Sequence, residues 1–118
     1  MSLSQTLADY CARVQYDDIP AHVRTYAKHA IIDQLGVCLR AGQTESPSTF
    51  VSRFARLMGG VGEVRVFDSG TKAPLINAAL ANGAVAVGTA LDGYHQPSAT
   101  HLLALLVPVC VSDRKSVV

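Results

Sequence analysis

From Pro74 onward the chain reads PLINAALANGAVAVGTAL, a stretch that ends at Leu91 and contains no charged residue. Its only polar side chains are those of Asn77, Asn82 and Thr89. A helix that is apolar on every side belongs in the interior of a protein. The stretch therefore predicts a buried helix with small side chains that allow close packing, and its two glycines could divide this helix into two pieces.

The residues that follow, 91–101, read LDGYHQPSATH and have a different character. They place one carboxylate (Asp92), one phenol (Tyr94) and two imidazoles (His95 and His101) between two segments that are almost free of charge. Such side chains transfer protons or bind carboxylates near neutral pH. We therefore expect a polar pocket at this loop, and we expect any chemistry of the chain to take place there.

Helical periodicity extends on both sides of these two stretches. It predicts helices over residues 3–14, 20–42, 47–58 and 102–112. Residues 63–67 instead alternate like a strand, and we expect an extended segment or a small hairpin that includes Lys72. The predicted fold class is all-α, with one short extended segment near 63–67.

Two of the predicted helices have a clear apolar stripe. In the helix over 20–42, Gly36 costs about 1 kcal/mol relative to alanine, which predicts that a neighbouring helix passes close to it. The stripe of that helix consists of Val23, Tyr26, Ala27, Ala30, Ile31, Leu35, Cys38 and Leu39. The stripe of the helix over 47–58 consists of Phe50, Val51, Phe54, Leu57 and Met58.

The composition limits the possible functions. With 118 residues the chain forms one domain at most. Its net charge of +1 does not suggest binding to nucleic acid or to an anionic membrane. Charged residues make up 16 %, against roughly 25 % in an average soluble domain. Because a small domain has proportionally more surface to cover, this deficit suggests that protein outside this chain normally covers some of its faces.

The cysteines and the chain ends favour a cytoplasmic location. Cys11, Cys38 and Cys110 are odd in number and far apart, so they resemble neither a disulfide framework nor a zinc site. We interpret Cys11 and Cys38 as small hydrophobic residues of helices. The first residues lack the features of a signal peptide, and the apolar run over 102–111 is shorter than the roughly 20 residues of a membrane span.

Each residue of the polar loop also has a purely structural interpretation. Asp92 could end the buried helix together with Gly93, and His101 could bond to the backbone at the start of the last helix. Tyr94 and His95 could be ordinary surface residues. A sharper alternative is a metal site, because Asp92, His95 and His101 are ligand types that suit zinc or iron.

A series of short motifs resembles the N-terminal part of the MmgE/PrpD family, which includes 2-methylcitrate dehydratase and cis-aconitate decarboxylase. The resemblance covers residues 3–112, nearly the whole chain, in the order of the family. The motifs are Asp17-Asp18-Ile19-Pro20, Ala27-Lys28, Asp33-x-Leu35-Gly36, Gly62-Glu63-Val64, Ala79-x-x-Asn82-Gly83, Leu91-Asp92-x-Tyr94-His95, His101 and Pro108.

The resemblance implies a mostly helical domain, completed by a smaller lid domain from later sequence, in a homodimer. It implies a lyase or epimerase that acts without a cofactor on small polycarboxylates, by elimination, decarboxylation or epimerisation. The positions of Asp92 and His101 would line the active site, with Tyr94 and His95 as substrate contacts. His101 would then act as an acid or base or hold a carboxylate, while Asp92 would orient it or bind a substrate hydroxyl.

The sequence departs from the family pattern at two places in the loop. Where the family usually has a second acidic residue, this chain has Gly93. After the histidine the family usually has small or polar residues, whereas Leu102 and Leu103 stand there in this chain. We expect the two leucines to narrow the pocket.

The chain is also much shorter than the members of that family. The ending DRKSVV (113–118) changes composition abruptly, and we interpret it as a non-native tail on a fragment that covers 3–112. We expect such a fragment to be catalytically incomplete, marginally stable and prone to associate through uncovered apolar faces. The alternative is a small helical module without catalytic activity that binds a partner through those faces.

Overall fold

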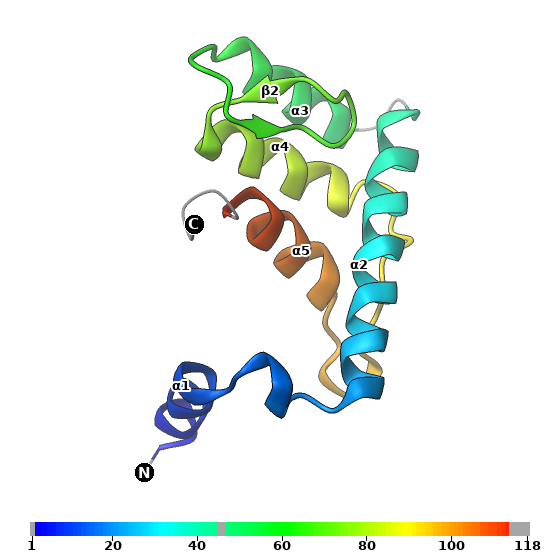
Figure 1. Ribbon diagram of the computed structural model, residues 1–118. Coiled ribbons are helices and arrows are strands. Elements are labelled where there is room, and N and C mark those ends of the chain that lie inside the picture. The colour runs from blue at the N-terminus through cyan, green and yellow to red at the C-terminus, as the bar shows by residue number, and fades with distance from the viewer. Residues whose placement is uncertain (1, 45–46, 114–118) are drawn as a thin grey trace.

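The computed structural model describes residues 2–44 and 47–113. This part of the chain is mostly helical, with one small antiparallel hairpin, which confirms the predicted fold class (Figure 1). In chain order the elements are α1 (Leu3–Arg13), the 3-10 turn η1 (Tyr16–Asp18), α2 (Ala21–Gly42), α3 (Pro47–Leu57), β1 (Val64–Arg65), β2 (Lys72–Ala73), α4 (Leu75–Ala86), the 3-10 turn η2 (Gln96–Ser98) and α5 (Leu102–Asp113).

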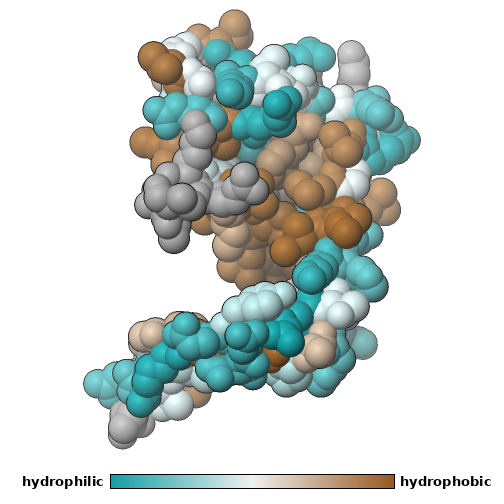
Figure 2. Space-filling model, viewed as in Figure 1, coloured by the Kyte–Doolittle hydropathy of each residue, from teal (hydrophilic) through white to brown (hydrophobic). Residues whose placement is uncertain are grey.

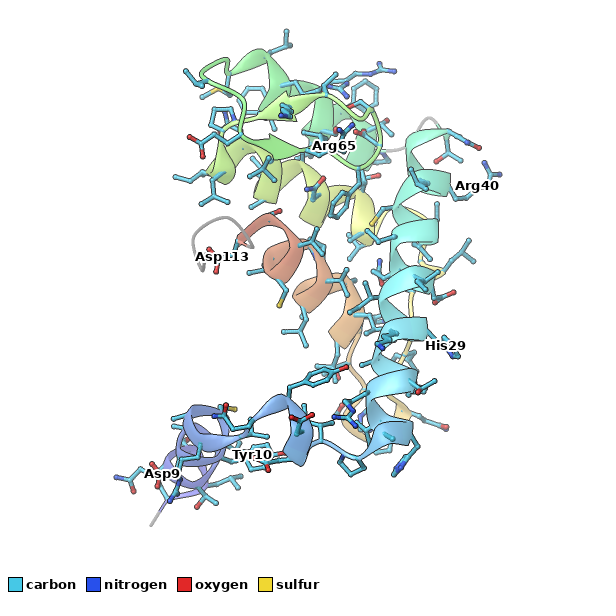
Figure 3. All side chains as sticks on the ribbon, viewed as in Figure 1. Asp9, Tyr10, His29, Arg40, Arg65 and Asp113 are labelled. Carbon is cyan, nitrogen blue, oxygen red and sulfur yellow. The ribbon has the colours of Figure 1, made fainter. Side chains whose placement is uncertain are left out.

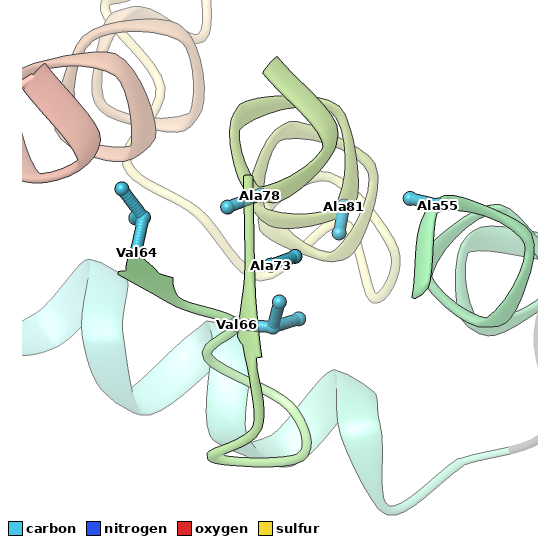
Figure 4. Packing of buried hydrophobic residues seen from close by; sticks show 6 residues of the cluster. All are labelled: Ala55, Val64, Val66, Ala73, Ala78 and Ala81. Atoms are coloured by element: carbon cyan, nitrogen blue, oxygen red, sulfur yellow. The ribbon is translucent and has the colours of Figure 1, made fainter. Parts of the chain in front are cut away.

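Helix α4, which comes from the uncharged stretch, is the element on which α2, α3 and α5 all pack (Figure 1). It takes part in two clusters of small buried side chains. The first cluster joins α4 to α3 and the hairpin and consists of Ala55, Val64, Val66, Ala73, Ala78 and Ala81 (Figure 4). The second joins α4 to α2 and α5 and consists of Cys38, Ala41, Val85, Ala86 and Ala104. Because these side chains are short, the backbones they connect lie close together.

The hairpin forms where the alternating pattern predicts it. Strand β1 pairs antiparallel with β2, with Val64 opposite Ala73 and Arg65 opposite Lys72. Val64 and Ala73 point into the core, whereas Arg65 and Lys72 are exposed. This alternation is what a hairpin with one buried face requires.

A single buried amide ties the hairpin to two helices. Asn82 of α4 is fully buried, and its Oδ1 accepts a hydrogen bond of 2.8 Å from the backbone N–H of Phe67. Its Nδ2 donates to the carbonyl of Arg65 at 3.1 Å and to Oγ of Ser112 in α5 at 3.4 Å. Asn82 thus satisfies backbone groups that would otherwise be buried without partners.

Helix α3 is turned opposite to the usual arrangement. An apolar stripe on a short helix normally faces the core. In this chain the buried residues are instead small and mostly polar, namely Ser48, Thr49, Ser52 and Ala55. The large apolar residues Phe50, Phe54 and Leu57 of α3 are exposed, as is Met58 directly after the helix.

Two predictions about glycines are wrong. An added Cβ at Gly36 would find nothing within 4 Å among the described residues, so no helix approaches there. Gly83 does not divide the predicted helix, because α4 continues through it, and α4 ends at Ala86, before Gly88 and Leu91. The buried face of α2 lies in its second half and includes Cys38, whereas Tyr26 in the first half is exposed.

Apolar side chains remain exposed over much of the described surface. Figure 2 shows hydrophobic residues gathered on the face that looks toward α1. Helix α5 also exposes Leu105, Leu106 and Val109. None of the helices within the described ranges is both long and apolar enough to cross a membrane. The exposed area agrees with the low content of charged residues in the sequence.

The three cysteines have different surroundings. Cys38 is buried, and this burial raises the pKa of its thiol above the ordinary value, which keeps it protonated and unreactive. Cys11 and Cys110 are exposed. Of the predicted tail, Asp113 is the last residue of α5, and residues 114–118 lie outside the described residues.

The role of Asn82 can be tested by substitution. We expect Asn82→Ala to lower the free energy of unfolding by about 2–3 kcal/mol, because it leaves buried backbone groups without partners. Asn77→Ala is the matched control and should cost less than about 0.5 kcal/mol, since the Asn77 side chain is only partly buried and donates a long, exposed hydrogen bond of 3.4 Å to the carbonyl of Gly59. Urea unfolding followed by circular dichroism measures both, and equal effects would contradict the assigned role.

Candidate active site

The polar loop between α4 and α5 is folded back on itself. The backbone N–H of His95 donates to the carbonyl of Thr100 at 2.9 Å, and the N–H of Thr100 donates to the carbonyl of His95 at 3.4 Å. Between them the turn η2 ends at Ala99, which adopts the left-handed conformation with φ of 51°. This closure brings the end of the loop back to its beginning, so that His101, directly before α5, lies beside Asp92.

The two residues brought together are Asp92 and His101. Oδ2 of Asp92 lies 2.8 Å from Nδ1 of His101, which is hydrogen-bond distance. The Asp92 side chain is only 2 % exposed, whereas that of His101 is 48 % exposed. A carboxylate can only accept, so the neutral imidazole donates its proton from Nδ1 and keeps a lone pair on Nε2. The arrangement is an oriented imidazole with a buried carboxylate behind it.

Tyr94 lies against this pair, whereas His95 makes its bond elsewhere. The centroids of the Tyr94 and His101 rings are 5.0 Å apart, with the ring planes tilted by 50°. Nδ1 of His95 instead lies 2.6 Å from Oγ of Ser98, which in turn lies 2.6 Å from Oγ1 of Thr100. The structure therefore groups Asp92, Tyr94 and His101 and places His95 in a separate polar chain of the same loop.

A small pocket of about 210 Å³ opens beside the grouped residues. Its lining consists of Tyr26, Gly93, Tyr94, His95, Leu102 and Leu103. Tyr26 belongs to α2, far away in the sequence, and its helical spacing indicated only a residue of an apolar stripe and not a pocket residue. Among the residues that the structure describes, no lysine or arginine lines this pocket. A substrate with several carboxylates would therefore need cations from outside this lining.

The two departures from the family pattern meet in the structure. A Cβ added at Gly93 would lie 2.8 Å from Cδ1 of Leu103, so the space that a side chain at position 93 would take is filled by the leucine. An acidic residue at position 93 and a leucine at position 103 would compete for the same volume. Leu102 and Leu103 both line the pocket.

Two of the alternative interpretations can be compared with this geometry. In the described residues no group of three His, Cys, Asp or Glu side chains lies close enough to hold a metal ion. Asp92 and His101 lie together, but His95 is bonded to Ser98 and does not complete a ligand set. The structural interpretation expected His101 to bond to the backbone. The structure instead shows a hydrogen bond between the His101 ring and the Asp92 side chain.

The fold and this pair define a helical domain with an aspartate-oriented histidine at the start of its last helix. The sequence profile of the MmgE/PrpD N-terminal domain matches residues 5–112, so the chain belongs to the MmgE/PrpD family. Comparison with curated proteins and with solved structures gave no match.

The orientation of the imidazole leads to a testable expectation. In the neutral ring of His101 the proton should reside on Nδ1, and Asp92→Ala should remove this preference because it removes the acceptor. Long-range ¹H–¹⁵N correlation spectra of the imidazole rings distinguish the two tautomers. His29, which points outward from α2 (Figure 3), is the control and should be unaffected by Asp92→Ala. A His101 ring that carries its proton on Nε2 in the unsubstituted chain would contradict the geometry.

Proposed function

We propose that this chain supplies part of the active site of a lyase of the MmgE/PrpD type, which acts on small polycarboxylates. The reaction would be an elimination like that of 2-methylcitrate dehydratase or a decarboxylation like that of cis-aconitate decarboxylase. Membership of the family supports the class of protein. The observation that carries the proposal is the 2.8 Å hydrogen bond between the buried Asp92 carboxylate and the half-exposed His101.

Elimination next to a carboxylate needs a base for the α-proton, an acid for the leaving hydroxyl and cations for the substrate carboxylates. In our proposal Nε2 of His101 either takes the α-proton of the substrate or gives a proton to the leaving hydroxyl, because Nδ1 is hydrogen-bonded to Asp92. Asp92 holds the imidazole in one orientation and stabilises the imidazolium when it forms, as a carboxylate does behind a catalytic histidine. Tyr94, which contacts the His101 ring, and His95, which shares the pocket, would contact the substrate.

The remaining parts of the proposed site would come from outside the pocket lining. Because the lining formed by the described residues contains no lysine or arginine, we propose that cationic residues of further sequence or of a second subunit hold the substrate carboxylates. The same proposal includes a homodimer, a cytoplasmic location and chemistry without a cofactor. By itself, this chain would then bind polycarboxylates weakly and turn them over very slowly.

One observation favours a second candidate, a helical module that binds a partner without catalysis. The exposed stripe of α3, with Phe50, Phe54 and Leu57, is the kind of apolar face that mediates protein–protein contact. This candidate predicts no effect of His101 on any reaction. The effect of His101→Ala on turnover therefore distinguishes this binding module from the lyase.

The proposal can be tested in a chimera, in which residues 5–112 replace the corresponding N-terminal segment of an active family member. We expect His101→Ala to lower kcat/KM of this chimera by about 10²–10⁴-fold, the usual contribution of a general acid or base. His29→Ala also removes an imidazole, one that points outward from α2 and lies away from Asp92, and should leave turnover within about twofold. Turnover that survives His101→Ala would refute the role of His101.

A further inference from the structure

We propose that a polar pocket between the end of α2, helix α3 and the loop of the hairpin binds a phosphate group, either as free phosphate or as part of a small phosphate monoester. The lining of this pocket contains neither Asp92 nor His101, so the proposal does not depend on the lyase function proposed above. Three features of the structure carry it: a wholly polar lining, an arginine held in place by a nearly buried carboxylate, and a second arginine whose charge is not balanced.

The pocket has a volume of about 330 Å³, at the lower end of the range of small-molecule sites. A Cβ added at Gly42 would lie 2.5 Å from Cβ of Asp68, so the glycine at the end of α2 allows the hairpin loop to come close. Apart from Gly42, every residue of the lining has a polar side chain. The residues that the argument uses are Gln43 after α2, Arg53 and Arg56 of α3, and Asp68 and Ser69 of the hairpin loop. Such a lining favours a charged ligand over an apolar one.

The carboxylate of Asp68 holds Arg56 at the pocket. Nη1 of Arg56 lies 3.5 Å from Oδ1 of Asp68, and the two side chains are 27 % and 6 % exposed. This distance is longer than the roughly 2.7–2.9 Å of a strong charge-assisted hydrogen bond. The contact involves one nitrogen of a guanidinium group that has five N–H donors. Asp68 therefore positions Arg56 and offsets its charge, while most of the donors of Arg56 stay available to a ligand.

Arg53 adds a positive charge that no carboxylate of the described residues balances. It precedes Arg56 by three positions, so the two side chains lie on the same side of α3. Its guanidinium lies 5.8 Å from the centroid of the Phe50 ring, and none of the ion pairs among the described residues includes it. Arg53, Arg56 and Asp68 together give the lining one excess positive charge. An anion that enters the pocket is therefore attracted to it, and more strongly than in open water because the site is partly shielded.

The donors come from three elements, and this arrangement favours phosphate over a carboxylate. The exposed side-chain amide of Gln43 offers two N–H donors from the end of α2. Oγ of Ser69 lies 2.9 Å from Oγ1 of Thr71, so the Ser69 hydroxyl can donate to a ligand while it accepts from Thr71. A planar carboxylate is satisfied by one guanidinium in a bidentate pair. A tetrahedral phosphate has oxygen atoms on all sides and can use two guanidinium groups and these neutral donors together.

The first test is a titration of the full chain with inorganic phosphate, followed by nuclear magnetic resonance at an ionic strength kept constant with sodium chloride. We expect saturable shifts of the pocket residues, and we expect Arg53→Gln to raise the Kd about tenfold or more, because it removes a charge-assisted hydrogen bond. Arg40→Gln is the matched control, since Arg40 is an exposed arginine on the outer side of α2 (Figure 3) and does not line the pocket. It should leave the Kd within about twofold, because it changes the net charge equally but removes no contact.

A second variant tests Arg56 without leaving a buried charge unpaired. Arg56→Gln alone would strand the nearly buried carboxylate of Asp68, so it is combined with Asp68→Asn, which keeps the net charge of the pocket unchanged. We expect this double variant to raise the Kd for phosphate about tenfold as well, because Arg56 contacts the ligand itself. Circular dichroism checks that each variant keeps its helices, and Arg53→Lys replaces Arg53→Gln if the latter unfolds.

Parallel titrations with glycerol 3-phosphate and with citrate identify the ligand. Tighter binding of glycerol 3-phosphate than of inorganic phosphate assigns the pocket to a phosphate monoester, and equal or weaker binding assigns it to free phosphate. The proposal is overturned if neither phosphate shows saturable binding, or if Arg53→Gln or the double variant binds phosphate as the unsubstituted chain does. Citrate that shifts the same pocket residues at lower concentration than both phosphates would also overturn it, because the pocket would then select carboxylates.

Discussion

The hydrogen bond between Asp92 and His101 is the constraint on which the rest of the arrangement depends. A carboxylate that is almost fully buried beside an uncharged helix is stable only with a partner. Its partner comes from the residue that starts α5, nine positions later in the chain. The pair thus fixes where the loop after α4 ends and where α5 begins. The loop that holds this bond connects α4 to α5. Because α2, α3 and α5 all pack on α4, the bond is tied to the packing of the whole core.

The structure also explains why the domain looks unfinished. The interior of the chain is built from alanine, valine and small polar side chains, whereas many of its largest apolar residues are exposed. The inversion is clear on α3, where Ser52 is fully buried whereas Phe54 is exposed. An isolated domain gains more by burying phenylalanine than by burying serine. The inversion is therefore consistent with a surface that is covered by other protein.

Much of the fold could be predicted from the sequence, because local rules decide it. Helical periodicity and the turn residues located the helices, and the alternation over 63–67 located the hairpin. The orientation of the helices could not be predicted in the same way. A stripe pattern records which side of a helix is apolar, but not whether this chain or another one covers that side. For this reason the sequence did not predict that the apolar stripe of α3 is exposed or that no described helix approaches Gly36.

The candidate site shows the same division between local and long-range information. Asp92, Tyr94 and His101 lie within one loop, so their unusual side chains in an apolar context were enough to single them out. Tyr26 of α2 lines the pocket together with Tyr94, and nothing in its local pattern distinguishes it from an ordinary apolar residue of a helix. The contact between Gly93 and Leu103 joins two departures from the family pattern that looked independent in the sequence.

A double-mutant cycle of stability tests most directly whether Asp92 and His101 act as one unit. The free energy of unfolding would be measured for the unsubstituted chain, Asp92→Ala, His101→Ala and the double variant. We predict a coupling energy of about 1–3 kcal/mol, since either single substitution already removes the charged hydrogen bond. Additive effects, with a coupling energy below about 0.5 kcal/mol, would show that the two side chains do not support each other and would contradict this account.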